Sequence, residues 1–157
     1  MVADKCEKAT ELGVVKELPI APKISAEIGL FFDHDFPVEQ VTEIMGLHPD
    51  ETSQKSLTQI NPITGHQNVG YWIHRIVTAY SFDCAAILLC IEKLLIEHAE
   101  DICKIKSQYD LESIMVRIYI YVEEEDEYPS IRLHPHLLNL LSNINASFDI
   151  VIENNYE

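Results

Sequence analysis

Glycine is scarce in this sequence, because the 157 residues include only 5 glycines. Neither phosphate-binding loop motif, Gly-x-Gly-x-x-Gly or Gly-x-x-x-x-Gly-Lys-Ser/Thr, occurs, so the sequence offers no nucleotide-binding loop of these kinds. The Gly-x-Ser-x-Gly turn that carries a nucleophilic serine in many hydrolases is also missing. We therefore expect no catalytic residues and no enzymatic activity, and we keep catalysis only as the least favoured alternative.

Basic side chains are also in short supply. The sequence has 11 lysines and arginines against 26 aspartates and glutamates, which gives a formal net charge of −15 at pH 7. Such a charge repels nucleic acids and anionic lipids, and it attracts cationic partners over long distances. We expect neither a nucleic acid nor a membrane as partner.

Long hydrophobic runs are absent as well. The longest run, residues 84–91, has eight residues, far fewer than the roughly twenty needed to cross a bilayer. Residues 1–8 are charged and lack the apolar stretch of a secretory signal, so we expect a cytoplasmic protein. The 4 cysteines include no Cys-x-x-Cys pair, and we expect most of them to be small buried hydrophobes of a reducing compartment rather than reactive thiols.

The apolar pattern that is present predicts an α+β fold. Period-two alternation marks strands, and recurrence every three to four residues marks helices. Strands are expected at about 24–32, 56–60 (weak), 71–77, 111–122, 129–133 and 146–153, and helices at about 37–46, 83–98, 99–107 and from 134. This order, βαββα(α)ββαβ, favours a single mixed, largely antiparallel sheet with helices packed on one face. Residues 1–22 are predicted to be a loosely ordered arm, and residues 23–157 a single domain.

Three segments carry a resemblance to a known family. They are PVEQVTEIMGLHPD at Pro37–Asp50, GYWI at Gly70–Ile73, and the segment Leu133–Ile152. In that order they resemble the "EeIteiLGl-Pd", "GYW" and "l-la-l-a-ldidiy" patterns of a widespread bacterial family known only as a domain of unknown function. The resemblance covers about residues 24–153 and implies a fold but no reaction, because its motifs are structural. Gln54-Lys55-Ser56 departs from the turn usual in that family.

A run of five acids, Glu123–Glu127, follows the most strand-like segment. Such a run is typical of a solvated turn that protects a sheet edge, and it also suits an acidic docking surface. Tyrosines beside it would supply aromatic anchors for a partner. The candidate partner-binding residues are Glu123, Glu124, Glu125, Asp126, Glu127, Tyr128 and Tyr121.

Several histidines have alternative interpretations. His134 and His136 together with His98, or the segment Asp33-His34-Asp35, contain metal-binding side chains, but a helix start and a solvated loop are the simpler explanation of them. His74 is expected to be a partly buried packing residue rather than a general base. We therefore expect neither a bound metal nor a cofactor.

In its small size, its acidic charge and its lack of catalytic residues, the chain resembles the immunity partners of contact-dependent inhibition and related toxin systems. The resemblance lies in size and charge, and it implies an acidic immunity or inhibitor protein that occludes a cationic toxin such as a nuclease. The alternative is a non-catalytic ligand- or protein-binding module of the unknown-function family, with a small-molecule pocket near Trp72. The sequence leaves the oligomeric state open.

Overall fold

The computed structural model of the chain describes residues 20–54, 70–123 and 127–154. Most of the predicted arm, the weak strand at 56–60 and residues 124–126 lie outside these ranges. The elements are β1 (Lys23–Phe32), α1 (Val38–Met45), β2 (Glu51–Ser53), β3 (Gly70–Tyr80), α2 (Ala85–Tyr109), β4 (Ser113–Val122), α3 (Pro135–Asn143) and β5 (Ala146–Asn154).

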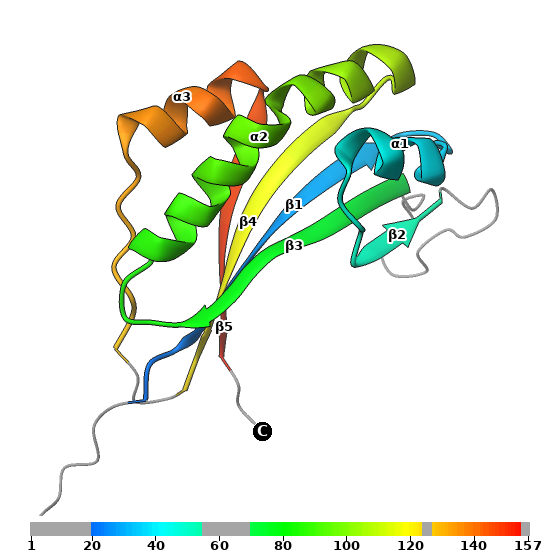
Figure 1. Cartoon of the computed structure of the whole chain (residues 1–157). Helices are drawn as coiled ribbons and strands as arrows, with labels where there is room; N and C mark the ends of the chain where they lie inside the picture. The colour runs from blue at the N-terminus through cyan, green and yellow to red at the C-terminus, as the bar shows by residue number, and fades with distance from the viewer. Residues whose placement is uncertain (1–19, 55–69, 124–126, 155–157) are drawn as a thin grey trace, which may run out of the picture.

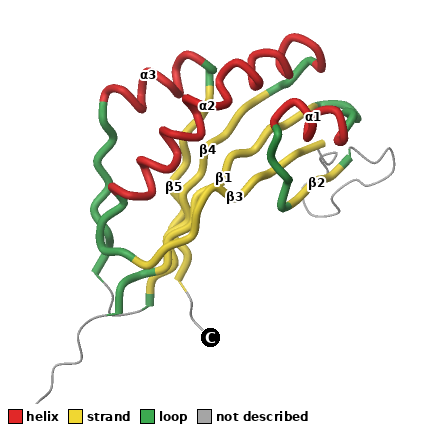
Figure 2. Tube along the Cα trace, viewed as in Figure 1, coloured by secondary structure: helices red, strands yellow, loops and turns green. Residues whose placement is uncertain are grey.

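The strands form one sheet in the order β2-β3-β1-β4-β5. Neighbouring strands are antiparallel, except that β4 and β5 run parallel and are joined by the crossover helix α3. The three helices all pack on the same face of this sheet (Figures 1 and 2). The predicted fold class, a mixed and largely antiparallel sheet with helices on one face, is confirmed.

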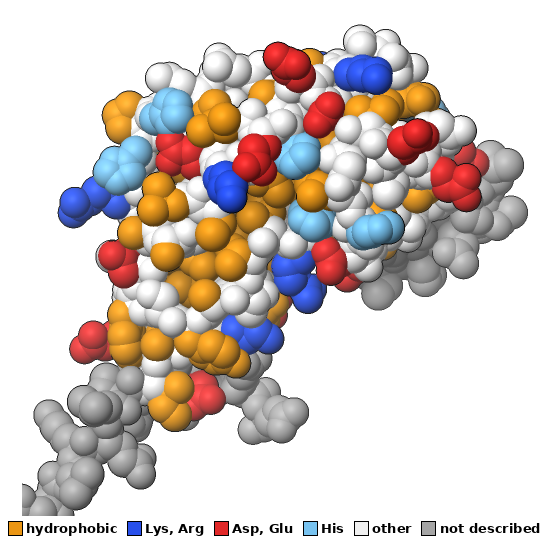
Figure 3. Space-filling model, in the orientation of Figure 1, with side chains coloured by type: hydrophobic (Ala, Val, Ile, Leu, Met, Phe, Trp, Pro, Cys, Tyr) orange, Lys and Arg blue, Asp and Glu red, His pale blue; other side chains and the backbone are white. Residues whose placement is uncertain are grey.

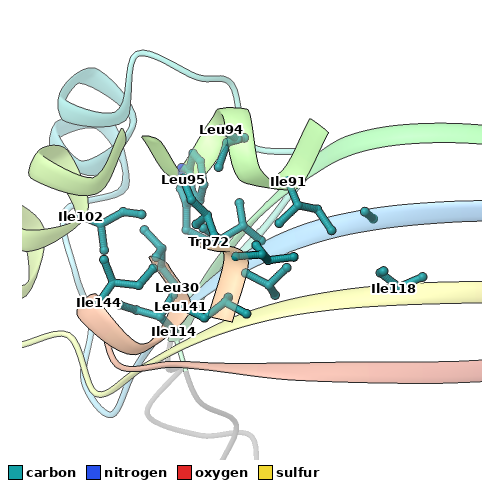
Figure 4. Packing of buried hydrophobic residues seen from close by; sticks show 14 of the residues in the cluster. Leu30, Trp72, Ile91, Leu94, Leu95, Ile102, Ile114, Ile118, Leu141 and Ile144 are labelled. Atoms are coloured by element: carbon teal, nitrogen blue, oxygen red, sulfur yellow. The ribbon is translucent and has the colours of Figure 1, made fainter. Parts of the chain in front are cut away.

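Alternating hydrophobic residues build the core between the sheet and the helices. Along β1, Ile24, Ala26, Ile28 and Leu30 are fully buried, and the residues between them point to the other face. Trp72 on β3 packs among leucines and isoleucines of the strands and helices, in the cluster shown in Figure 4. Each such aliphatic side chain stabilises the fold by about 1.5–3 kcal/mol relative to an exposed position.

Both short helices begin where the sequence predicts, and α1 also ends there. Pro37 precedes α1, and the helix ends at Gly46 with φ of 62°, a left-handed conformation that favours glycine. The Gly46 amide donates a hydrogen bond to the Thr42 carbonyl at 2.9 Å. Pro135 occupies the first turn of α3, where its missing amide hydrogen has no intrahelical partner to lose.

Two local predictions were wrong. The helix predicted to be interrupted near residue 99 is continuous as α2, because Ile102 and Ile105 are fully buried and extend its apolar face. The predicted return strand at residues 129–133 does not form, and Ser130 makes only an isolated bridge to Asp83. Both edges of β4 are already paired, one with β1 and the other with β5, so no free edge is left for a hairpin partner.

Candidate protein-binding face

The second face of the sheet carries no helix of the described part of the chain (Figures 1 and 2). Alternation along the strands directs every second side chain to this surface, which we call the open sheet face. Its main members are Lys23, Ser25, Glu27 and Phe31 of β1, Glu51 of β2, Tyr71, Ile73 and Arg75 of β3, Met115, Arg117, Tyr119 and Tyr121 of β4, and Asp149, Val151 and Glu153 of β5. The helix side, shown in Figure 3, also mixes acidic, basic and hydrophobic side chains.

Four charged residues form a row of alternating sign across the open sheet face. Glu27 of β1 is paired with Arg75 of β3 on one side and with Arg117 of β4 on the other, and Arg117 is paired in turn with Asp149 of β5. Arg117 Nη2 lies 3.2 Å from Asp149 Oδ2. Opposite charges on adjacent strands attract one another, so the row fixes these side chains relative to the sheet.

Tyr119 links the centre of this row. Its hydroxyl accepts a hydrogen bond from Arg117 Nη1 at 3.1 Å and donates one to Glu27 Oε1, also at 3.1 Å. Burial raises the pKa of Tyr119, and the neighbouring Glu27 carboxylate raises it further, while the Arg117 guanidinium opposes this shift. The hydrogen bond to Tyr119 and the bond to Asp149 raise the pKa of Arg117. The phenol therefore stays neutral between a fixed anion and a fixed cation.

Aromatic rings on the same face already hold cations. The rings of Tyr119 and Tyr121 are stacked, with centroids 6.2 Å apart and an interplanar angle of 18°. Lys23 Nζ lies 5.3 Å from the centroid of the Tyr121 ring, and Arg117 Cζ lies 5.7 Å from that of Tyr119. Both distances are within the range of cation–π attraction, so these tyrosines form a surface to which positive groups are drawn.

A hollow of about 220 Å³ opens on this face. We call it the acidic hollow, and its lining residues are Ser25, Glu27, Glu51, Arg75, Tyr119, Tyr121 and Glu153. Ser25 is small and lies on β1 between the larger Lys23 and Glu27, so the surface is lower there than around it. Three carboxylates and one guanidinium leave the lining with a formal charge of 1 − 3 = −2. A polar hollow of this charge suits a cationic group better than an anion.

Of the predicted partner-binding residues, the structure places one on this face. Tyr121 lies on it, half-buried, and lines the acidic hollow. Glu123 and Glu127 are exposed just beyond the end of β4, and Tyr128 is 64% exposed. Glu124, Glu125 and Asp126 lie outside the described residues. The sequence prediction missed Glu27, Arg117 and Asp149, although each is a charged residue inside an otherwise apolar strand segment.

The histidines of the alternative metal sites have separate partners. His136 contacts Glu92, and His98 Nδ1 lies 3.1 Å from Asp101 Oδ2. A hydrogen bond with Asp33 raises the pKa of His34. In residues 20–54, 70–123 and 127–154 no three metal-binding side chains come together.

His74 and Trp72 pack beside each other on β3. Their rings are stacked at 6.1 Å, and His74 Nδ1 lies 2.7 Å from the His48 carbonyl oxygen. Trp72 is 0% exposed, and its Nε1 donates a hydrogen bond to Thr42 Oγ1 at 3.0 Å. Trp72 lines neither the acidic hollow nor a second hollow of about 290 Å³ on the helix side, between the start of α2 and α3. The tryptophan therefore belongs to the core.

The cysteines do not share one environment. Cys84 is buried, and this burial raises the pKa of its thiol, which opposes formation of a reactive thiolate. Cys90 and Cys103 are exposed on α2, so the expectation of small buried hydrophobes was wrong for these two. Their apolar sequence neighbours belong to other sides of the same helix.

In the described part of the chain, no helix is long and apolar enough to cross a membrane.

Comparison with known proteins identifies the family but not the activity. A family model described as "Domain of unknown function (DUF4279)" matches residues 22–155. Neither a curated protein nor a solved structure gives a significant match. The matched range includes every strand and helix of the structure. The chain therefore belongs to this family of unknown function.

Proposed function

We propose that the chain is a non-catalytic immunity or inhibitor protein of the cytoplasm, which binds a basic protein toxin and occludes its active site. The observation that carries this proposal is the open sheet face with its acidic hollow. The face lies on the opposite side of the sheet from the helices, and it presents carboxylates and tyrosines together. Aromatic anchors surrounded by charge are typical of protein-binding surfaces.

Charge supports a cationic partner. The net charge of −15 would steer a basic protein toward the chain, and Glu123 and Glu127 are exposed beyond the end of β4. Nucleases bind phosphate with arginine and lysine side chains, so their substrate sites are basic. An acidic surface that covers such a site would compete directly with the nucleic acid. This argument favours a nuclease as the class of toxin.

The size of the face is adequate for a specific complex. Strand β4 has 10 residues and spans about 33 Å, and the spacings between the five strands of the sheet add up to about 19 Å. The resulting area of about 600 Å² approaches the roughly 800 Å² that each partner contributes to a standard interface.

The face is also rigid, because its side chains stand on paired strands. Tyr119, Glu27, Arg117 and Asp149 hold one another by hydrogen bonds, so few side chains would have to be ordered on binding. A preorganised surface loses less conformational entropy when the complex forms. We expect little movement of this sheet between the free and bound states.

The proposal is tested by capture of a partner. The tagged chain is produced together with the products of the neighbouring reading frames and purified at low and at high salt. We expect a one-to-one complex with a basic protein, whose activity is blocked and whose affinity falls with salt. Retention of no protein at either salt, or of a protein that remains fully active in the complex, would contradict the proposal.

A matched pair of variants locates the surface. Glu51→Gln with Glu153→Gln removes two charges from the open sheet face, and Glu97→Gln with Glu100→Gln removes two from the helix side. Both double variants change the net charge equally. We expect only the first to weaken the complex strongly, by about tenfold for each lost charge pair. Equal effects would place the binding surface elsewhere.

A further inference from the structure

We infer that the acidic hollow is a receptor for one arginine side chain of the basic partner, an inference that rests on the proposed function. The hollow measures about 220 Å³, which is smaller than the roughly 300–1,000 Å³ of pockets for whole small-molecule ligands. It therefore fits the end of a side chain better than a complete metabolite. Its position on the open sheet face leaves room for the rest of a protein ligand.

The hydrogen-bonding groups of the hollow match a guanidinium. This group has five donors and no acceptor, so it needs several acceptors around one plane. Glu27, Glu51 and Glu153 supply carboxylates from three different strands. A carboxylate and a guanidinium form paired, parallel hydrogen bonds, which a lysine ammonium cannot form.

Ser25 adds a hydrogen-bond acceptor to the hollow that is separate from the carboxylates. This residue is only 6% exposed, and it lines the hollow from β1. Its hydroxyl makes no hydrogen bond within the described part of the chain. Among the described residues, Arg117 Nε alone is a buried side-chain nitrogen or oxygen without a hydrogen-bond partner, so the Ser25 hydroxyl is accessible from the hollow and can accept a hydrogen bond from a donor of a partner. A guanidinium N–H would supply that donor.

The tyrosines favour arginine over lysine for a second reason. A guanidinium is planar and weakly hydrated, so it stacks on aromatic rings more readily than an ammonium. Arg117 already lies over the Tyr119 ring in this way, and the stacked Tyr121 ring forms another part of the lining. Arg75 is the opposing feature, because its positive charge in the lining repels an incoming cation. Its removal should therefore strengthen binding.

The first test uses short peptides as probes. Acetyl-Gly-Arg-Gly-amide, its lysine counterpart and its citrulline counterpart are titrated into the full chain, and binding is followed by amide chemical shifts. We expect the arginine peptide to bind with shifts at the hollow, the lysine peptide to bind several-fold more weakly, and the neutral citrulline peptide not to bind. Equal binding of arginine and citrulline peptides, or shifts confined to the helices, would overturn the inference.

Variants sharpen this test. Glu153→Gln should lower the affinity for the arginine peptide by about tenfold, and Arg75→Gln should raise this affinity several-fold. Glu100→Gln on α2 should leave the affinity unchanged. Glu153 makes no hydrogen bond within the described residues, so its substitution tests the site without disturbing the fold. Free arginine that binds more tightly than the peptide would indicate a metabolite site and would also overturn the inference.

The two proposals fail in different ways. A salt-sensitive complex with a basic protein that is weakened by Glu51→Gln with Glu153→Gln, but without binding of the arginine peptide, would refute only the arginine receptor. If the arginine peptide binds as expected but no basic protein is retained, the inhibitor function fails and the recognition chemistry of the hollow stands.

Discussion

Arg117 and Asp149 lie opposite each other on the two parallel strands of the sheet, with Arg117 Nη2 3.2 Å from Asp149 Oδ2. The arginine side chain is 27% exposed and the aspartate 45%, so solvent screens their attraction only in part. Arg117 Nε is buried and has no hydrogen-bond partner among the described residues. The ion pair thus links the edge strand β5 to β4, although one donor of the pair, Arg117 Nε, stays without a hydrogen bond among the described residues.

Asp149→Asn should lower the free energy of unfolding by about 1 kcal/mol, because it leaves a partly buried guanidinium without its anion. Arg117→Met should lower it less, since it also removes the unpaired Nε. Urea denaturation measures both changes. Glu97→Gln, which breaks the exposed Lys93–Glu97 pair on α2, is the control and should change stability by less than about 0.5 kcal/mol. A loss for Asp149→Asn no larger than the control would contradict the assignment.

Tyr119→Phe should make the stability of the protein less sensitive to alkaline pH. The folded protein holds the phenolic proton more tightly than the unfolded chain, because burial raises the pKa of Tyr119. This contribution is fully present below about pH 10, the ordinary pKa of tyrosine, and is lost as the pH rises through the folded-state pKa. Thermal melts between neutral pH and about pH 11 should show a smaller decline in Tyr119→Phe than in the wild type.

At neutral pH the same substitution should be destabilising. It removes the bonds to Glu27 and Arg117, with a loss of about 1 kcal/mol. The raised pKa of Cys84 also makes the stability of the protein decline as the pH becomes alkaline. This effect is the same in the wild type and in Tyr119→Phe. Identical pH profiles for the two proteins would show that Tyr119 does not titrate differently on folding.

Gly46→Ala should lower the free energy of unfolding by about 1 kcal/mol. The cause is backbone strain, because Gly46 has φ of 62° and a Cβ atom there would meet no atom within 4 Å. Gly46→Asn should recover part of the loss, since asparagine tolerates this conformation better than alanine. Urea midpoints of the three proteins give the comparison. Full stability of Gly46→Ala would mean that the turn after α1 can readjust.

Trp72→Phe should lower the free energy of unfolding by about 2 kcal/mol. The smaller ring leaves unfilled volume in the core, and the Thr42 hydroxyl loses the indole N–H donor at 3.0 Å. Thr42→Val removes only the hydroxyl and should cause a smaller loss, of about 1 kcal/mol. Guanidinium denaturation with circular dichroism separates these effects. Retention of full stability in Trp72→Phe would contradict the packing described for this site.

Local chemistry in the sequence was sufficient to predict several elements. Alternation along residues 24–32 predicted β1, and the pair Pro37 and Gly46 correctly bounded α1, because proline fixes φ at a helix start and glycine permits the left-handed turn at a helix end. The same applies to Pro135 before α3. These signals act locally, so they can be detected without knowledge of the tertiary fold.

The candidate site required information that the sequence pattern does not contain. Glu27 aligns with Arg75 only because β1 and β3 shift register between Ala26 and Glu27, which places Ile76 outside the pairing. Arg117 meets Asp149 only because β5 pairs in parallel with β4, where a hairpin return was predicted instead. Strand register and strand order are set by the packing of the whole domain. The charge row therefore appeared only in the structure.

The hydrogen bond from Tyr119 to Glu27 joins residues 92 positions apart in the chain. During synthesis, β1 therefore leaves the ribosome long before the strand that completes its neighbourhood, and β5 emerges later still. Contacts between such distant segments form slowly, because a long loop must close first. An incompletely translated chain can expose Glu27 but cannot assemble the open sheet face, so only finished molecules would present this surface.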